Sequence, residues 1–175
     1  MEALDKEKIY FENLPQLLEK SAEQYGDNDA LSIAGGVSYT YREIRDLATK
    51  VATGVYGSGM KKGDRVALIS ENNPHWVAAY FGIMKAGAVV TPVLTDFTDK
   101  EMTSILDHAG AKMVFISARQ LKKFEGGFPG SVEYLVTVED MVIHPVADLK
   151  KLVKEAGESF VKIKPQPAEN ETVRF

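Results

Sequence analysis

The sequence predicts an α/β fold, with a mainly parallel sheet, flanking helices and a short hairpin near the N-terminus. Short apolar runs alternate along the chain with segments whose apolar residues recur at helical spacing, a pattern typical of βαβ units. Several of the expected strands are continuously apolar, which indicates a sheet covered on both faces. Several of the expected helices begin at a Thr or Asn cap and end at a glycine.

The N-terminal third is predicted to hold two helices around a hairpin. Residues 14–25 place apolar side chains on one stripe of a helix, which a polar, glycine-containing stretch then ends. Two short extended runs around a Gly-Gly pair predict a hairpin over residues 31–39. Thr40 starts the second helix, because Glu43 completes a capping box with it, and residues 57–59 end that helix.

The middle of the chain is predicted to form a strand–helix–strand unit. Residues 65–70 contain an uninterrupted apolar run and are expected to form a buried strand. Asn73 is a good cap, and the proline after it suits the first position of a helix over 74–86. Gly87 is expected to end that helix in a left-handed conformation, before a second strand at 89–93.

The last third continues the alternation. Thr98 and Glu101 form a second capping box, and the helix that follows is expected to end at Gly110. The remaining expected elements are strands at 113–116 and 134–138, a short helix at 121–124, and a helix at 147–156 closed by Gly157. We assign one α/β domain to residues 1–160 and a linker to residues 161–175, where two prolines occur.

Composition excludes several classes of function. The hydrophobic fraction of 45% and the charged fraction of 26% are normal for a globular domain. A net charge of −4 gives no indication of a nucleic-acid partner, and the absence of cysteine excludes disulfides and thiolate chemistry. No stretch approaches the roughly 20 apolar residues of a membrane helix, and no signal peptide is recognisable. We therefore expect no transmembrane segment and a cytoplasmic location.

The sequence offers no catalytic or metal-binding motif. The glycine-rich stretch at 57–63 lacks the spacing of a phosphate-binding loop, and it follows a helix and precedes a strand, the wrong context for one. The histidines, His75, His108 and His144, stand far apart and outside any paired metal-ligand spacing. We therefore assign no catalytic residue and no metal ligand.

One weak candidate site follows from the expected fold. Ligands of open α/β sheets bind beyond the carboxyl ends of the strands. Polar and aromatic residues that follow two of the expected strands could form the rim of such a crevice: Asn72, Asn73, Trp76, Thr95 and Asp96. The simpler interpretation, which we favour, is that Asn73 caps a helix and Trp76 packs.

Segments of this chain resemble the adenylate-forming enzymes, in the order and spacing of that family. They are residues 39–44, 59–68, 71–80, 85–93 and 105–112. The stretches at 72–76 and 94–98 are most similar to bacterial long-chain fatty-acid–CoA ligases. The resemblance implies the N-terminal subdomain of the adenylate-forming fold. It also implies a parent enzyme that uses ATP, magnesium and coenzyme A to convert a fatty acid to its acyl-CoA through an acyl-adenylate.

The family's Ser/Thr/Gly-rich ATP-binding loop is absent from this chain, as is its C-terminal domain with a catalytic lysine. We expect that loop to follow residues 169–175. No catalytic residue of the family can therefore be placed here, and we expect this chain to be a piece that is inactive and binds none of those cofactors alone. An uncovered sheet edge should favour self-association or a homodimer. The alternatives are an aryl-CoA ligase, an amino-acid adenylation domain, or a stand-alone non-catalytic α/β binding protein.

Overall fold

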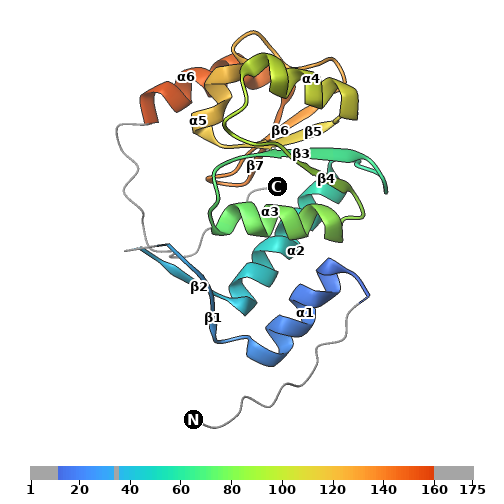
Figure 1. The fold of residues 1–175 in the computed structure, drawn as a ribbon, viewed down its shortest axis with the longest axis vertical. Helices are drawn as coiled ribbons and strands as arrows, with labels where there is room; N and C mark the ends of the chain where they lie inside the picture. The colour runs from blue at the N-terminus through green and yellow to red at the C-terminus, as the bar shows by residue number, and fades with distance from the viewer. Residues whose placement is uncertain (1–11, 34–35, 160–175) are drawn as a thin grey trace.

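The computed structural model describes residues 12–33 and 36–159, and it has the predicted α/β architecture (Figure 1). The strands are β1 Asp29–Ser32, β2 Ser38–Thr40, β3 Arg65–Ile69, β4 Val89–Pro92, β5 Met113–Ile116, β6 Tyr134–Thr137 and β7 Val142–Pro145. The helices are α1 Leu14–Tyr25, α2 Tyr41–Gly57, α3 Pro74–Lys85, α4 Asp99–Ala109, α5 Ala118–Leu121 and α6 Leu149–Ser159, with 3₁₀ turns η1 Lys122–Phe124 and η2 Val146–Asp148.

The main sheet has the strand order β4-β3-β5-β6-β7. Its first four strands are mutually parallel, and only β7 runs antiparallel to its neighbour β6. Helices α2 and α3 lie against one face of the sheet, while α4, α5 and α6 cover the other (Figure 1). This arrangement brings the carboxyl ends of β3, β4, β5 and β6 to the same edge.

The predicted hairpin forms a separate two-stranded sheet. Strands β1 and β2 pair antiparallel, with an irregularity in register between Asp29 and Leu31. The predicted Gly-Gly turn lies partly outside the described residues. The hairpin leads directly into α2, so its position is set by the helix that follows.

The predicted caps start and end helices where the sequence places them. Both capping boxes form, Thr40 with Glu43 and Thr98 with Glu101. Asn73 caps α3 through its side-chain oxygen, which accepts a hydrogen bond from the backbone of Trp76 at 2.9 Å. Gly87 and Gly110 have left-handed φ values of 82° and 59° after α3 and α4. Local polar chemistry therefore decides most of the helix boundaries.

The C-terminal part of the chain departs from the sequence prediction. Strand β7 was not expected, and the helix expected at 147–156 is a 3₁₀ turn followed by α6, which continues past Gly157 to Ser159. The short helix expected at 121–124 is α5 followed by η1, beginning at residue 118. The expected linker at 161–175 lies outside the described residues. Glycine lowers helix propensity by only about 1 kcal/mol, which the packing of an apolar helix face outweighs.

Strands β3, β5 and β6 each contribute to two apolar cores. In β3, Val66 and Leu68 pack with the cluster under α2 and α3, whereas Ala67 and Ile69 pack with the cluster under α4 and α6. All four side chains are fully buried. Alternate residues of a strand point to opposite faces, so a sheet covered twice requires an unbroken apolar run.

Helices α2 and α3 pack closely because a glycine lies at their contact. A Cβ atom added to Gly82 would stand 2.5 Å from the Cβ of Val51 and 2.6 Å from the carbonyl oxygen of Ala48. No side chain fits at that separation without movement of the α2 backbone. The two helices therefore form one rigid layer under the sheet.

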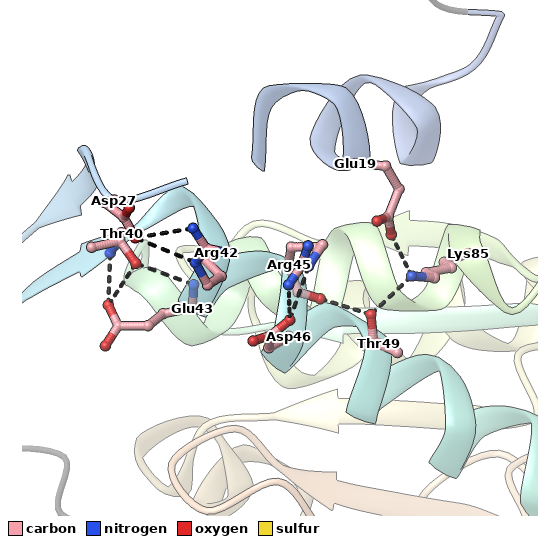
Figure 2. Close-up of polar contacts among 9 residues, drawn as sticks. All are labelled: Glu19, Asp27, Thr40, Arg42, Glu43, Arg45, Asp46, Thr49 and Lys85. Atoms are coloured by element: carbon pink, nitrogen blue, oxygen red, sulfur yellow. Dashed lines mark hydrogen bonds and ion pairs between the residues drawn. The ribbon is translucent and has the colours of Figure 1, made fainter. Parts of the chain in front are cut away.

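Polar contacts attach α1 and the turn that follows it to this layer (Figure 2). The ammonium of Lys85 donates to the Glu19 carboxylate of α1 and to the hydroxyl of Thr49 on α2, the latter at 2.8 Å. Arg42 at the start of α2 forms an ion pair with Asp27 at 3.0 Å. In residues 12–33 and 36–159, no helix combines the length and apolar character needed to cross a membrane.

Candidate functional site at the carboxyl ends of the strands

A hollow of about 290 Å³ lies where strands β3 and β4 end. We call it the strand-end hollow. One wall is the loop between β3 and α3, and the other is the end of β4 with the loop before α4. The residues that line it are Ser70, Glu71, Asn72, Trp76, Pro92, Val93, Leu94 and Thr95. This is the edge where open α/β sheets bind their ligands.

The structure brings together three of the residues expected at a crevice rim. Asn72, Trp76 and Thr95 all line the strand-end hollow. Asn73 does not line it and instead caps α3. Asp96 lies beside a different and more open depression next to η1. Three of the five expected rim residues therefore line this hollow, and Asn73 forms the helix cap that the sequence also allows. A ligand-binding role for any of them stays a prediction.

Trp76 combines packing with exposure to the hollow. Its ring stacks on Tyr80 with ring centroids 5.2 Å apart, and it packs against the apolar cluster beneath α3. The rest of the indole is available at the hollow wall, where Leu94 on the opposite loop is 67% exposed. The hollow thus offers apolar surface as well as polar groups.

Glu71 lies in the same loop as Asn72 but was not among the rim residues expected from the sequence. Its carboxylate accepts a hydrogen bond from the side-chain amide of Gln120 at 2.7 Å, and Arg119 lies 3.9 Å away. Burial raises the pKa of Glu71, but the hydrogen bond from Gln120 and the other nearby donors and charges outweigh it, so the pKa is lowered. Glu71 is therefore ionised at neutral pH and gives the hollow a negative charge.

A second carboxyl at the same edge is shifted in the opposite direction. Glu139, after β6, accepts a hydrogen bond from the backbone N–H of Ala118 at 2.9 Å. Partial withdrawal from water raises the pKa of Glu139, and the neighbouring Asp140 and Glu71 carboxylates raise it further. As the pH falls, Glu139 therefore takes up a proton before Glu71 does.

The second wall of the hollow is held by a lysine from elsewhere in the chain. The Lys123 ammonium donates to the carbonyl oxygens of Thr95 at 2.6 Å and of Phe97 at 2.9 Å. The β4–α4 loop is thereby fixed to η1. Nothing in the sequence around Lys123 distinguishes it from a surface lysine.

The arrangement suits one wall of a binding site better than a centre for phosphate chemistry. An ionised Glu71 repels a triphosphate. The glycine-rich stretch at 57–63 lies before β3, at the other end of that strand, and the N–H of Gly63 is already bonded to the carbonyl of Gly87 at 2.9 Å. Among the described residues, no group of three His, Asp or Glu side chains is placed to hold a metal ion.

Comparison with known proteins identifies the family. Residues 18–173 match the family described as AMP-binding enzyme. The chain belongs to this family. The resemblance seen in the sequence is thereby confirmed, and so is the expectation of the adenylate-forming fold.

Several curated relatives are CoA ligases, and others are subunits of a plipastatin synthase of Bacillus subtilis. One of the ligases is a methyl-dioxo-octahydroindenyl-propanoyl:CoA ligase of Mycobacterium tuberculosis, to which the chain is 40% identical over 102 residues. The matched region is 58% of this chain and 20% of the relative. The chain is also 33% identical over 112 residues to a crotonobetaine/carnitine–CoA ligase of Escherichia coli. That matched region is 62% of this chain and 22% of the relative. The chain therefore spans only about a fifth of the length of these relatives.

A solved structure supports the fold. A fatty acyl CoA synthetase of Mycobacterium tuberculosis superposes with a TM-score of 0.66 at 23% identity, over 91% of this chain and 31% of that one. The likeness extends across nearly all of the described elements. It indicates that the sheet and its two helical layers are those of the N-terminal region of adenylate-forming enzymes.

Proposed function

We propose that this chain is part of an AMP-forming acid–CoA ligase and that the acid is a long-chain fatty acid. The match to the AMP-binding enzyme family over residues 18–173 carries the proposal. Two of the curated relatives are named as CoA ligases, which favours coenzyme A as the acceptor. The similarity of residues 72–76 and 94–98 to bacterial long-chain ligases supports a fatty acid.

The proposed reaction has two steps. A carboxylate oxygen attacks the α-phosphate of ATP, with release of diphosphate, and the coenzyme A thiol then displaces AMP to form the thioester. Magnesium would stabilise charge on the phosphates of the complete enzyme. The residues described here do not form a site for the triphosphate or the metal, so we assign this chain a wall of the site and none of the reacting groups.

Acyl transfer by the whole enzyme tests this proposal. The polypeptide encoded by the native reading frame that contains this chain is supplied with ATP, magnesium and coenzyme A. AMP formation is then measured with palmitate, benzoate or a proteinogenic amino acid. We expect AMP and palmitoyl-CoA in equal amounts with palmitate, and little product from the other acids.

The outcomes separate the alternatives. Preference for benzoate or for an amino acid would contradict the fatty-acid assignment and leave the ligase assignment intact. Absence of AMP formation with every acid would contradict the ligase itself and favour a non-catalytic binding role. Omitting coenzyme A is the matched control, because adenylate formation alone then gives diphosphate without thioester.

We further propose that the ligase acts in the cytoplasm and that this chain self-associates. Strand β4 pairs only with β3 among the described strands, and Val89 on it is 49% exposed. Open strand edges with apolar side chains favour pairing between chains. Light scattering over a range of concentrations should detect dimers, and a monomer at all of them would contradict the proposal.

A further inference from the structure

The short helical segment at residues 118–124, formed by α5 and η1, is firmly anchored in one core. Leu121 and Phe124 are each only 1% exposed and belong to the cluster beneath α4 and α6. The ring of Phe124 also stacks on Phe128, with centroids 4.2 Å apart. The backbone N–H of Ala118 is bound by Glu139. The segment is therefore a fixed point from which other groups can be held.

Two polar side chains from this segment reach two different loops. Gln120 holds the Glu71 carboxylate in the β3–α3 loop at 2.7 Å. Lys123, three residues further on, holds the carbonyls of Thr95 and Phe97 in the β4–α4 loop. These two loops supply the walls of the strand-end hollow. The segment at residues 118–124 therefore forms hydrogen bonds with both walls of the strand-end hollow.

Core stability alone does not explain Gln120. Its side chain is 4% exposed, and its amide oxygen has no hydrogen-bond partner among the described residues. A buried acceptor without a partner is unfavourable, and an apolar side chain of similar size would avoid that cost. What Gln120 provides instead is a donor at a defined position beside Glu71.

We propose that Gln120 and Lys123 are positioning residues that set the separation of the two walls and so the shape of the strand-end hollow. Gln120 fixes the orientation of the Glu71 carboxylate, and Lys123 prevents the β4–α4 loop from swinging away from η1. This proposal rests on the contacts in this chain and does not depend on the proposed ligase activity.

The only tryptophan of the sequence gives a direct readout, because Trp76 lines the hollow. The experiment compares the unaltered chain with Lys123→Met, Lys123→Arg and Gln120→Met. Acrylamide quenching of Trp76 reports how open the hollow is, and hydrogen exchange of residues 94–97 reports loosening of the loop. Lys154→Met, on the exposed side of α6, is the matched control.

Loss of the two charge-assisted hydrogen bonds of Lys123 should accelerate exchange in residues 94–97 by about tenfold and increase quenching of Trp76. Lys123→Arg should give hydrogen exchange and Trp76 quenching close to those of the unaltered chain, since arginine keeps the charge and the hydrogen-bond donors. Gln120→Met should increase quenching of Trp76 without accelerating exchange in residues 94–97. Lys154→Met should change neither.

Two results would overturn the proposal. The first is unchanged exchange and quenching in folded Lys123→Met and Gln120→Met. The second is faster exchange spread evenly over the whole sheet, which indicates a general loss of stability. If Lys123→Met does not fold, Gln120→Met and Lys123→Arg still decide the question, because quenching must rise in the first and stay near the unaltered value in the second.

Discussion

The two loops that wall the strand-end hollow leave neighbouring parallel strands, yet they are held in different ways. The β3–α3 loop is fixed largely by its own residues, because Asn73 both caps α3 and donates from its side chain to the Glu71 carbonyl at 3.1 Å. The β4–α4 loop depends on Lys123, which is 28 residues away from Thr95 in sequence. Local contacts therefore fix the backbone of the β3–α3 loop, where Gln120 orients only the Glu71 side chain, whereas a long-range contact holds the backbone of the β4–α4 loop.

Because the two loops are held differently, changes in one should affect the stability of the fold, and changes in the other should affect the shape of the hollow. A loop fixed by a helix cap loses helix stability when the cap is removed. A loop held by a distant side chain can open while the helices and the sheet remain folded. We expect substitutions in the sheet and helix layer to affect both walls, substitutions at Asn73 to affect stability, and substitutions at Lys123 to affect the conformation of one loop.

The largest effect should follow from Phe115→Ala, which removes the support beneath both walls. Phe115 is 2% exposed in β5, between β3 and β6. Truncating a buried phenylalanine costs about 3–5 kcal/mol. Chemical denaturation should show a loss of this size, and a loss below roughly 1 kcal/mol would mean that the core at β5 is not packed as described.

Gly82→Ala should have the next largest effect and should act mainly beneath the β3–α3 wall. The added methyl group collides with Val51 and with the backbone of Ala48, so α3 must move away from α2. Overpacking of this kind costs about 1–3 kcal/mol, although alanine is the better helix former. Gly57→Ala is the matched control, since the space around that glycine is open. Equal stability of the two variants would contradict the close helix contact.

Asn73→Ala tests how the β3–α3 loop is fixed. Loss of the α3 cap should lower the free energy of unfolding by about 0.5–2 kcal/mol. Asn73→Asp should retain most of the stability, because aspartate is an equally good cap. Urea denaturation of the three proteins measures this, and an alanine variant as stable as the unaltered chain would show that the cap does not contribute.

The smallest effect is expected at the capping box that ends the β4–α4 loop. Hydrogen bonds from the backbone and side chain of Thr98 lower the pKa of Glu101. A lowered pKa in the folded state means that the ionised carboxylate stabilises the fold above the ordinary glutamate range near pH 4.3, and that this contribution is lost as the pH falls through the folded-state pKa.

Glu101→Gln should therefore change stability little at low pH and lower it slightly at neutral pH, because glutamine also serves in a capping box. Thermal unfolding at neutral and acidic pH compares the two proteins. An identical dependence on pH in both would show that Glu101 does not contribute through its charge.

The sequence predicted the features that depend on neighbours in the chain. The capping boxes, the Asn73 cap and the glycine helix ends need only residues a few positions apart, so their chemistry is visible in the sequence. Glu71 and Gln120 are 49 residues apart, and neither has a distinctive local pattern. Their contact follows only from the order of the strands.

Strand β7 was missed for a related reason. The turn before it places Met141 at a φ of 56°, a conformation that a sequence pattern assigns to glycine or asparagine. Asp140 holds this turn by accepting from the backbone N–H of Val142 at 3.1 Å and from the Thr137 hydroxyl. Burial of the Met141 side chain supports the unusual backbone. Tertiary packing here overrides the local preference.

We propose that this chain supplies a wall of a ligase site and not its reacting groups. The most direct test is diphosphate release from ATP in the presence of magnesium and palmitate, measured for this chain alone and for the polypeptide of the full native reading frame. We predict release by the longer polypeptide and none above the protein-free control from this chain. Acid-dependent release by this chain alone would contradict the account.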